Sequence, residues 1–147
     1  MAVMPLPVSE MQDFLEMPTG MKSRRSWRAK FGDAFRGLKL GVRGHSSFFV
    51  HFFFAALVLA AGIVLRCEPL EWCLLLGCIG MVLTAELFNS AIETLYRGLD
   101  AATKARTRGC LDIAAGAVLM ASILAAVIGA IVFSARLIEL LARQSGT

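Results

Sequence analysis

Three polar side chains recur at helical spacing inside an otherwise apolar stretch of this sequence. Glu86, Asn89 and Glu93 are three and four residues apart, so on an α-helix they fall within about 60° of arc. Placing a carboxylate inside a membrane helix costs free energy unless the group is paired or has a functional role. Two carboxylates with an amide between them therefore indicate a functional face. Hydrogen bonding between helices is the alternative explanation.

The chemistry that suits this face is phosphoryl transfer. Carboxylate oxygens bind Mg²⁺ well, and a carboxylate in a medium of low dielectric holds a proton more tightly and can serve as a general base. Nearby basic residues would hold phosphates, since phosphoryl transfer is mostly positioning and charge neutralisation. The sequence has no GxxxxGK[ST] loop, no HExxH pair and no evident Ser/His/Asp arrangement. A lipid acceptor would enter from the bilayer.

The elements that must position these residues are predicted to be membrane helices. The chain is 57% hydrophobic, and its apolar stretches cover 48–65, 72–92 and 113–134. Each is long enough for a hydrocarbon core, which takes about 20 residues. We therefore predict an all-α membrane protein. The short connection 66–71 predicts an antiparallel hairpin, and 97–112 predicts a longer basic connection.

The basic residues gather beside the predicted spans. The net charge is +4, and Lys and Arg concentrate in 22–43 and 97–108. Such runs next to membrane helices indicate binding to anionic lipid head groups rather than to nucleic acid. The positive-inside rule then places both runs and the N-terminus in the cytoplasm, and the C-terminus on the outer side. The membrane is expected to be the plasma (inner) membrane. The first run also carries one apolar stripe, typical of an amphipathic helix in the interface plane, formed by Trp27, Phe31, Phe35, Leu38 and Val42.

These observations predict a four-part organisation. We expect a disordered N-terminal tail over 1–21, a cytoplasmic amphipathic surface helix over 22–44, a three-helix membrane domain over 45–136 and a C-terminal tail over 137–147. Residues 135–144 would either continue the third helix or form a short interfacial one.

Three short stretches resemble one known family. Residues 85–93, AELFNSAIE, resemble the signature of the prokaryotic diacylglycerol kinase family, which includes the undecaprenol kinases. Residues 112–119, DIAAGAVL, are similar to the start of that family's third membrane helix. Residues 34–39, AFRGLK, are similar to its surface-helix motif. The spacing between these motifs also matches, over about 30–135.

The resemblance implies a lipid kinase that is a homotrimer of three-span subunits, with sites between them. It implies MgATP as donor and the hydroxyl of a membrane lipid alcohol, undecaprenol or diacylglycerol, as acceptor. By this resemblance Glu86 is the general base, Asn89 orients the substrate and Glu93 binds Mg²⁺, with His45 as a further candidate ligand. The nucleotide would be held by Asp112, Arg36, Lys39 and Arg108.

Three departures from the family pattern leave alternatives open. His45 stands where the family has a second metal-binding Glu, Arg97 where it has an Asp, and Leu111 where it has a Lys. The alternative function is a catalytically weak or inactive membrane scaffold of the same fold. A small transporter with carboxylates along a proton path is a third hypothesis. His51, inside the first apolar stretch, is expected to be a hydrogen-bonded structural histidine.

Overall fold

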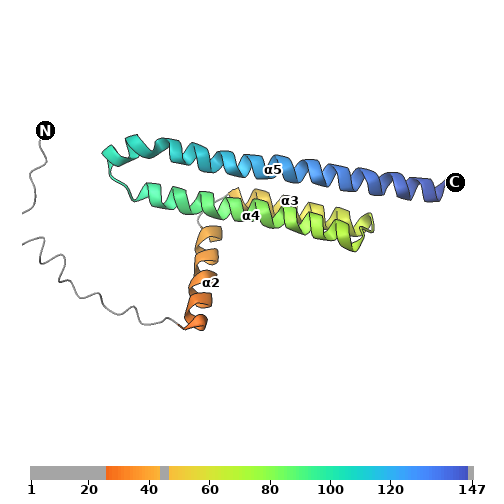
Figure 1. Ribbon diagram of the computed structural model, residues 1–147, viewed down its shortest axis with the longest axis horizontal. Helices are drawn as coiled ribbons and strands as arrows, with labels where there is room; N and C mark the ends of the chain where they lie inside the picture. The colour runs from red at the N-terminus through yellow and green to blue at the C-terminus, as the bar shows by residue number, and fades with distance from the viewer. Residues whose placement is uncertain (1–25, 44–46, 146–147) are drawn as a thin grey trace, which may run out of the picture. The chain divides into compact units, whose positions relative to one another are not determined.

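The computed structural model describes residues 26–43 and 47–145, and these residues form α-helices with no strand among them (Figure 1). The all-α prediction is therefore confirmed for this part of the chain. The predicted tail over 1–21 lies outside the described residues. The helices are α2 (Trp27–Arg43), α3 (Ser47–Val64), α4 (Pro69–Arg97) and α5 (Ala101–Gln144).

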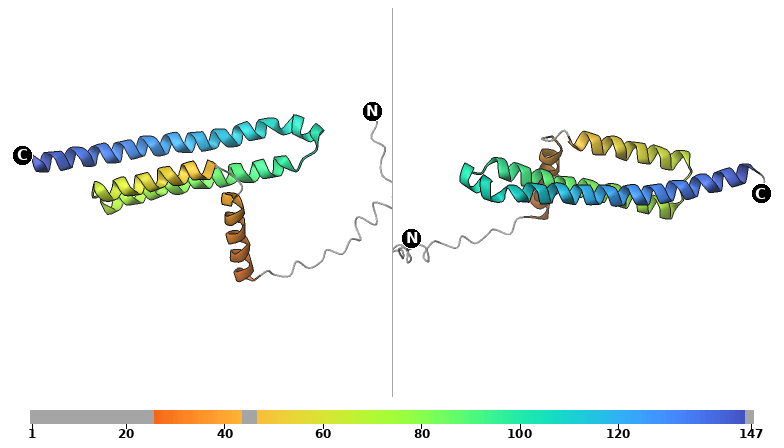
Figure 2. Two further views of the ribbon diagram at one scale, coloured as in Figure 1. Left: turned by 180° about the vertical axis from the view of Figure 1, so that it is seen from behind. Right: turned by 90° about the horizontal axis from the view of Figure 1, so that it is seen from above.

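Helices α3, α4 and α5 are each long and apolar enough to cross a membrane. They lie side by side and alternate in direction (Figures 1 and 2). Large apolar side chains cover their outer surfaces; Phe53 is 65% exposed and Met120 74%. A water-soluble monomer rarely exposes contiguous apolar surface of this extent. Lipid is the environment that this surface fits.

The segment predicted as a surface helix contains α2, and the amphipathic character of this helix stays a prediction. Trp27, Phe31 and Phe35 are 73%, 63% and 70% exposed, and the Lys30 ammonium lies 4.6 Å from the centroid of the Trp27 ring. Aromatic rings with basic neighbours suit a membrane interface. Its location in the plane of the interface stays a prediction, as does the orientation of the termini.

Helix α4 begins earlier than the apolar pattern alone predicts. Pro69 occupies its first turn, and Glu68 and Glu71 form a capping box in which the Glu71 carboxylate accepts the Glu68 amide at 2.6 Å. These contacts satisfy backbone donors that a helix start leaves unpaired. The predicted hairpin between the first two spans is confirmed, with a turn at residues 65–68.

The long basic connection predicted over 97–112 is wrong. Helix α5 already begins at Ala101, because the Asp100 side chain accepts the backbone N–H groups of Ala102 and Thr103 at 3.0 Å each. The hydrogen bond from the Thr103 hydroxyl, and then those from the backbone, hold the pKa of Asp100 below its usual range. Helix α5 continues to Gln144, so residues 135–144 continue the third helix.

The three spanning helices pack with α4 in contact with both others. Gly62 on α3 is buried against Trp72 on α4, where an added Cβ would lie 2.9 Å from a ring carbon. Glycine thus permits the close approach of the two helices. Leu75 and Phe48 are the large apolar side chains with almost no exposure, 1% and 2%.

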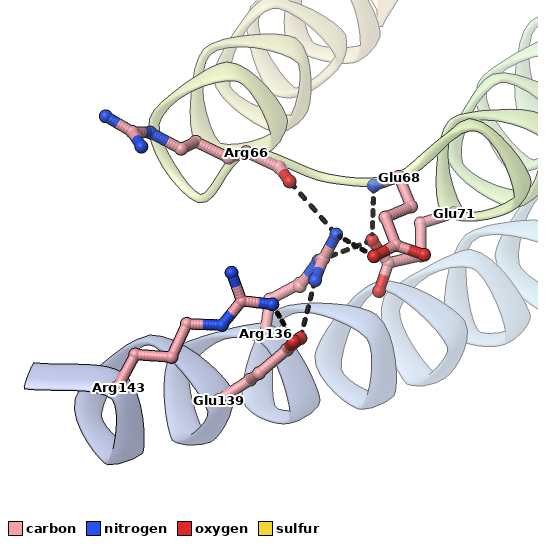
Figure 3. Close-up of polar contacts among 6 residues, drawn as sticks. All are labelled: Arg66, Glu68, Glu71, Arg136, Glu139 and Arg143. Carbon is pink, nitrogen blue, oxygen red and sulfur yellow. Dashed lines mark hydrogen bonds and ion pairs between the residues drawn. The ribbon is translucent and has the colours of Figure 1, made fainter. Parts of the chain in front are cut away.

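A group of charged side chains, the Arg136 cluster, joins α5 to the turn between α3 and α4 (Figure 3). The Arg136 guanidinium donates to Glu71 at 2.7 Å, to Glu139 at 2.5 Å and to the Arg66 carbonyl at 3.1 Å. It also pairs with Glu68 at 3.2 Å. The cluster consists of Arg136, Glu68, Glu71, Glu139 and Arg143.

Every carboxylate of the Arg136 cluster contacts a guanidinium, with three carboxylates around two arginines. Arg143 donates to the second oxygen of Glu139 at 2.5 Å, and the Arg136 side chain is only 9% exposed. Burial, and then the neighbouring Glu71 carboxylate, raise the pKa of the Cys67 thiol, so this thiol stays neutral. The cluster therefore links α5 to the turn between α3 and α4, and each of its carboxylates has a cationic partner.

Candidate active site

Glu86 lies on α4, and two side chains of α3 lie beside its carboxylate. The carboxylate is 2% exposed. The Ser47 hydroxyl donates to Oε1, and His51 Nε2 lies 3.8 Å from Oε2. Ser47 and His51 are one helical turn apart, so both face the same stretch of α4. The two oxygens of Glu86 are thus approached by different groups of one helix.

Asn89 and Glu93 extend the polar face by one further turn of α4. Asn89 is 9% exposed, and its amide Nδ2 donates to Glu93 Oε1 at 3.1 Å. Glu93 is half-buried, and its Oε2 accepts a hydrogen bond from Arg97 at 3.2 Å. Arg97, one of the departures from the family pattern, therefore contacts the predicted metal ligand.

These side chains fit a Mg²⁺ ion that arrives with phosphates. Because the Asn89 amide donates through nitrogen to Glu93, its carbonyl oxygen remains an acceptor beside a half-exposed carboxylate. Proteins commonly bind Mg²⁺ through one or two carboxylates, with phosphate and water oxygens completing the octahedron. The described residues contain no group of three or more His, Cys, Asp or Glu arranged to hold a metal alone. His45, the further candidate ligand, lies outside the described residues.

The predicted nucleotide contacts are all exposed. Arg36 and Lys39 are on α2, and Arg108 and Asp112 are in the first part of α5. Helices α4 and α5 are antiparallel, which places Asp112 level with Asn89. A cavity of about 720 Å³ lies at this level and is lined by Asn89, Phe88, Cys110 and Ile113 among others.

An apolar groove approaches the site from within the bundle. It has a volume of about 480 Å³ and is lined by all three spanning helices. Nearly all of its lining is apolar, and its polar side chains are His51 and Ser122. His51 borders this groove and also lies 3.8 Å from Glu86, so one side chain stands between the groove and the buried carboxylate.

Two contacts of Glu86 were not predicted from the sequence. His51 was expected to be structural, and Ser47 was given no role. The signal was their spacing of four residues, which places both on one face of the first span. Ser90 was also missed: it is 1% exposed, and its hydroxyl has no hydrogen-bond partner among the described residues.

Comparison with known proteins finds a family resemblance that covers more of the chain than the three short motifs at 34–39, 85–93 and 112–119. A family model described as prokaryotic diacylglycerol kinase matches residues 32–133, more than two thirds of the chain. The chain is a member of the prokaryotic diacylglycerol kinase family. The matched region contains Glu86, Asn89, Glu93 and Asp112, and also the departures at His45, Arg97 and Leu111.

A curated relative supports the same assignment for this family member. The undecaprenol kinase of Bacillus subtilis (strain 168) is 29% identical over 107 residues, which are 73% of this chain and 87% of the relative. No solved structure matches the chain. Family membership and the three spanning helices make this chain a multi-pass membrane protein of a lipid kinase family.

Proposed function

We propose that the protein transfers the γ-phosphate of ATP to the hydroxyl of a membrane lipid alcohol, undecaprenol or diacylglycerol. The observation that carries this proposal is Glu86, a buried carboxylate on a membrane helix whose two oxygens face a hydroxyl and an imidazole. Asn89 and Glu93 extend the same face. Family membership supports a lipid kinase; the donor, metal and acceptor are the proposed parts.

In the proposed reaction Glu86 is the general base. Its carboxylate takes the proton of the lipid hydroxyl as that oxygen attacks the γ-phosphorus. The new oxygen–phosphorus bond forms while the bond from the γ-phosphorus to the β,γ-bridging oxygen breaks, so ADP leaves and a lipid phosphate results. The proton then passes from Glu86 to water. A positioned base of this kind contributes about 10²- to 10⁴-fold in rate.

Glu93 and Asn89 would hold Mg²⁺, which supplies neutralisation of charge on the phosphate oxygens. The basic side chains of Arg36, Lys39 and Arg108 would hold the remaining phosphate charge, and Asp112 would contact the nucleotide. Arg97, which contacts Glu93, would keep that carboxylate in place beside Asn89.

The apolar groove suits the hydrocarbon chain of the acceptor. Its volume of about 480 Å³ falls within the usual range for small-molecule sites, roughly 300–1,000 Å³. The lining is apolar apart from Ser122 and His51, and His51 is the lining residue that lies beside Glu86. A chain bound there would bring its hydroxyl toward Glu86 without passing through water.

The test is a phosphoryl-transfer assay on the full chain in bicelles. Undecaprenol, diacylglycerol and a long-chain alkanol would each be supplied with γ-labelled ATP, with and without Mg²⁺. We expect Mg²⁺-dependent label in at least one lipid, and a loss of about 10²- to 10⁴-fold in turnover for Glu86→Gln. Equal turnover by this variant would refute the proposed base.

The scaffold alternative makes a different prediction in the same experiment. It rests on the substitutions His45, Arg97 and Leu111 at family positions. A scaffold would transfer no label to any lipid and would bind no MgATP at millimolar concentration. Recovery of transfer by His45→Glu would then attribute the inactivity to the changed metal position.

A further inference from the structure

His51 contacts two environments that differ strongly in polarity. One side of its ring borders the apolar groove, together with Val50, Phe54 and Leu83. Its Nε2 atom faces Glu86 Oε2 at 3.8 Å, and the side chain is 18% exposed. An imidazole in an apolar environment is unfavourable unless its nitrogens find partners. The carboxylate of Glu86 is the partner that this geometry provides.

The distance of 3.8 Å between His51 Nε2 and Glu86 Oε2 is short enough for an ion pair but longer than a hydrogen bond. Contacts within active sites often shorten when substrate binds, and a shift of about 1 Å would make this one a hydrogen bond of about 2.8 Å. Ser47, one turn earlier on α3, already holds the other oxygen. Glu86 thus has one donor of α3 bonded to Oε1 and the His51 ring near Oε2.

Orientation matters for a base of this kind. The terminal torsion of a glutamate is broad, so its carboxylate plane is not fixed by rotamer preference. The Ser47 hydroxyl restrains that plane through Oε1, and a hydrogen bond from the His51 ring to Oε2 would fix it. We propose that His51 is a positioning residue that holds Glu86 for proton transfer from the acceptor hydroxyl. This inference rests on Glu86 acting as the base in the proposed function.

Three substitutions of His51 distinguish a role in positioning Glu86 from a role in packing. Glutamine places its amide nitrogen close to the position of Nε2, asparagine places its own close to Nδ1, and leucine keeps apolar volume without a donor. We expect His51→Gln to keep turnover within a few-fold of the wild type. We expect His51→Leu and His51→Asn to lower kcat by about 10- to 100-fold, the scale of a misplacement near 1 Å.

The Michaelis constants give a readout that a packing role would not produce. We expect KM for ATP and for the lipid to stay within about twofold in all three variants, because the lost interaction acts in the transition state. In the Glu86→Gln background, His51→Leu should have no further effect, because the two residues act as a unit. If His51 only filled space, leucine would be the best substitute, and the two amides would be equally poor.

The outcomes distinguish this inference from the function on which it rests. Loss of transfer in Glu86→Gln together with a wild-type rate in His51→Leu would overturn the role of His51 and leave the lipid kinase intact. Equal losses for His51→Gln and His51→Leu would overturn it as well. Absence of transfer by the wild type would overturn the proposed function and the inference with it. Thermal melting of each variant shows that the rates refer to folded protein.

Discussion

Carboxylates lie toward both ends of the α3–α4 hairpin, and their burial and partners differ: Glu86 is 2% exposed, whereas Glu71 and Glu139 are 23% and 43% exposed around a buried Arg136. In the Arg136 cluster the carboxylates of Glu71 and Glu139 contact a guanidinium directly (Figure 3). At the other end, Glu86 faces a hydroxyl and an imidazole. The carboxylates of the first group are paired with permanent cations, whereas Glu86 has a hydroxyl and an imidazole as neighbours. The first arrangement stabilises the fold, and the second suits chemistry.

Glu93 lies between these two cases and sharpens the comparison. It pairs with Arg97 at 3.2 Å, as a structural carboxylate would, but it is half-buried and contacts Asn89. We expect Glu93→Gln to raise the Mg²⁺ concentration for half-maximal kinase activity by roughly 10- to 100-fold. The measurement is a Mg²⁺ titration of initial rates, with Arg97→Gln as the control that keeps the carboxylate. An unchanged titration with a lowered melting temperature would place Glu93 with the structural carboxylates instead.

Breaking the Arg136 cluster should affect stability more than chemistry. Arg136→Met leaves Glu71 and Glu139 without their central cation, and we expect a fall in melting temperature of roughly 5–10 °C. The kcat of the folded fraction should stay close to wild type, because the cluster contacts no predicted site residue. Adding Glu71→Gln to Arg136→Met should restore part of the stability. A large loss of kcat at unchanged melting temperature would contradict the division between the two ends.

The smallest expected effect concerns the cap of α5. Hydrogen bonds to the Asp100 carboxylate lower its pKa, so the cap stabilises the helix start at neutral pH and is lost as the pH falls below the usual aspartate value of 3.8. We expect Asp100→Ala to speed hydrogen exchange at Ala102 and Thr103 with little change in kinase rate. Asp100→Asn should keep the acceptor and reduce the dependence on pH. Slow exchange in both variants would show that the cap is dispensable.

Local sequence patterns predicted much of this architecture. Apolar runs located the three spans, and helical spacing placed Asn89 and Glu93 in contact along α4. The start of α5 was missed because the decisive signal was a single capping residue, Asp100, rather than hydropathy. The polar contacts between helices could not be predicted from the sequence, because they depend on how neighbouring helices are aligned along their axes. Ser47 and Glu86 are 39 residues apart, and Arg136 and Glu71 are 65 apart.

Glu86, and not a carboxylate of the Arg136 cluster, is the proposed base of the lipid kinase reaction. The most direct measurement compares lipid phosphorylation by Glu86→Gln and Glu71→Gln, two identical changes on one helix. We expect a loss of about 10²- to 10⁴-fold in kcat for Glu86→Gln and near wild-type kcat for Glu71→Gln. A wild-type rate for Glu86→Gln, or equal losses in the two folded variants, would contradict it.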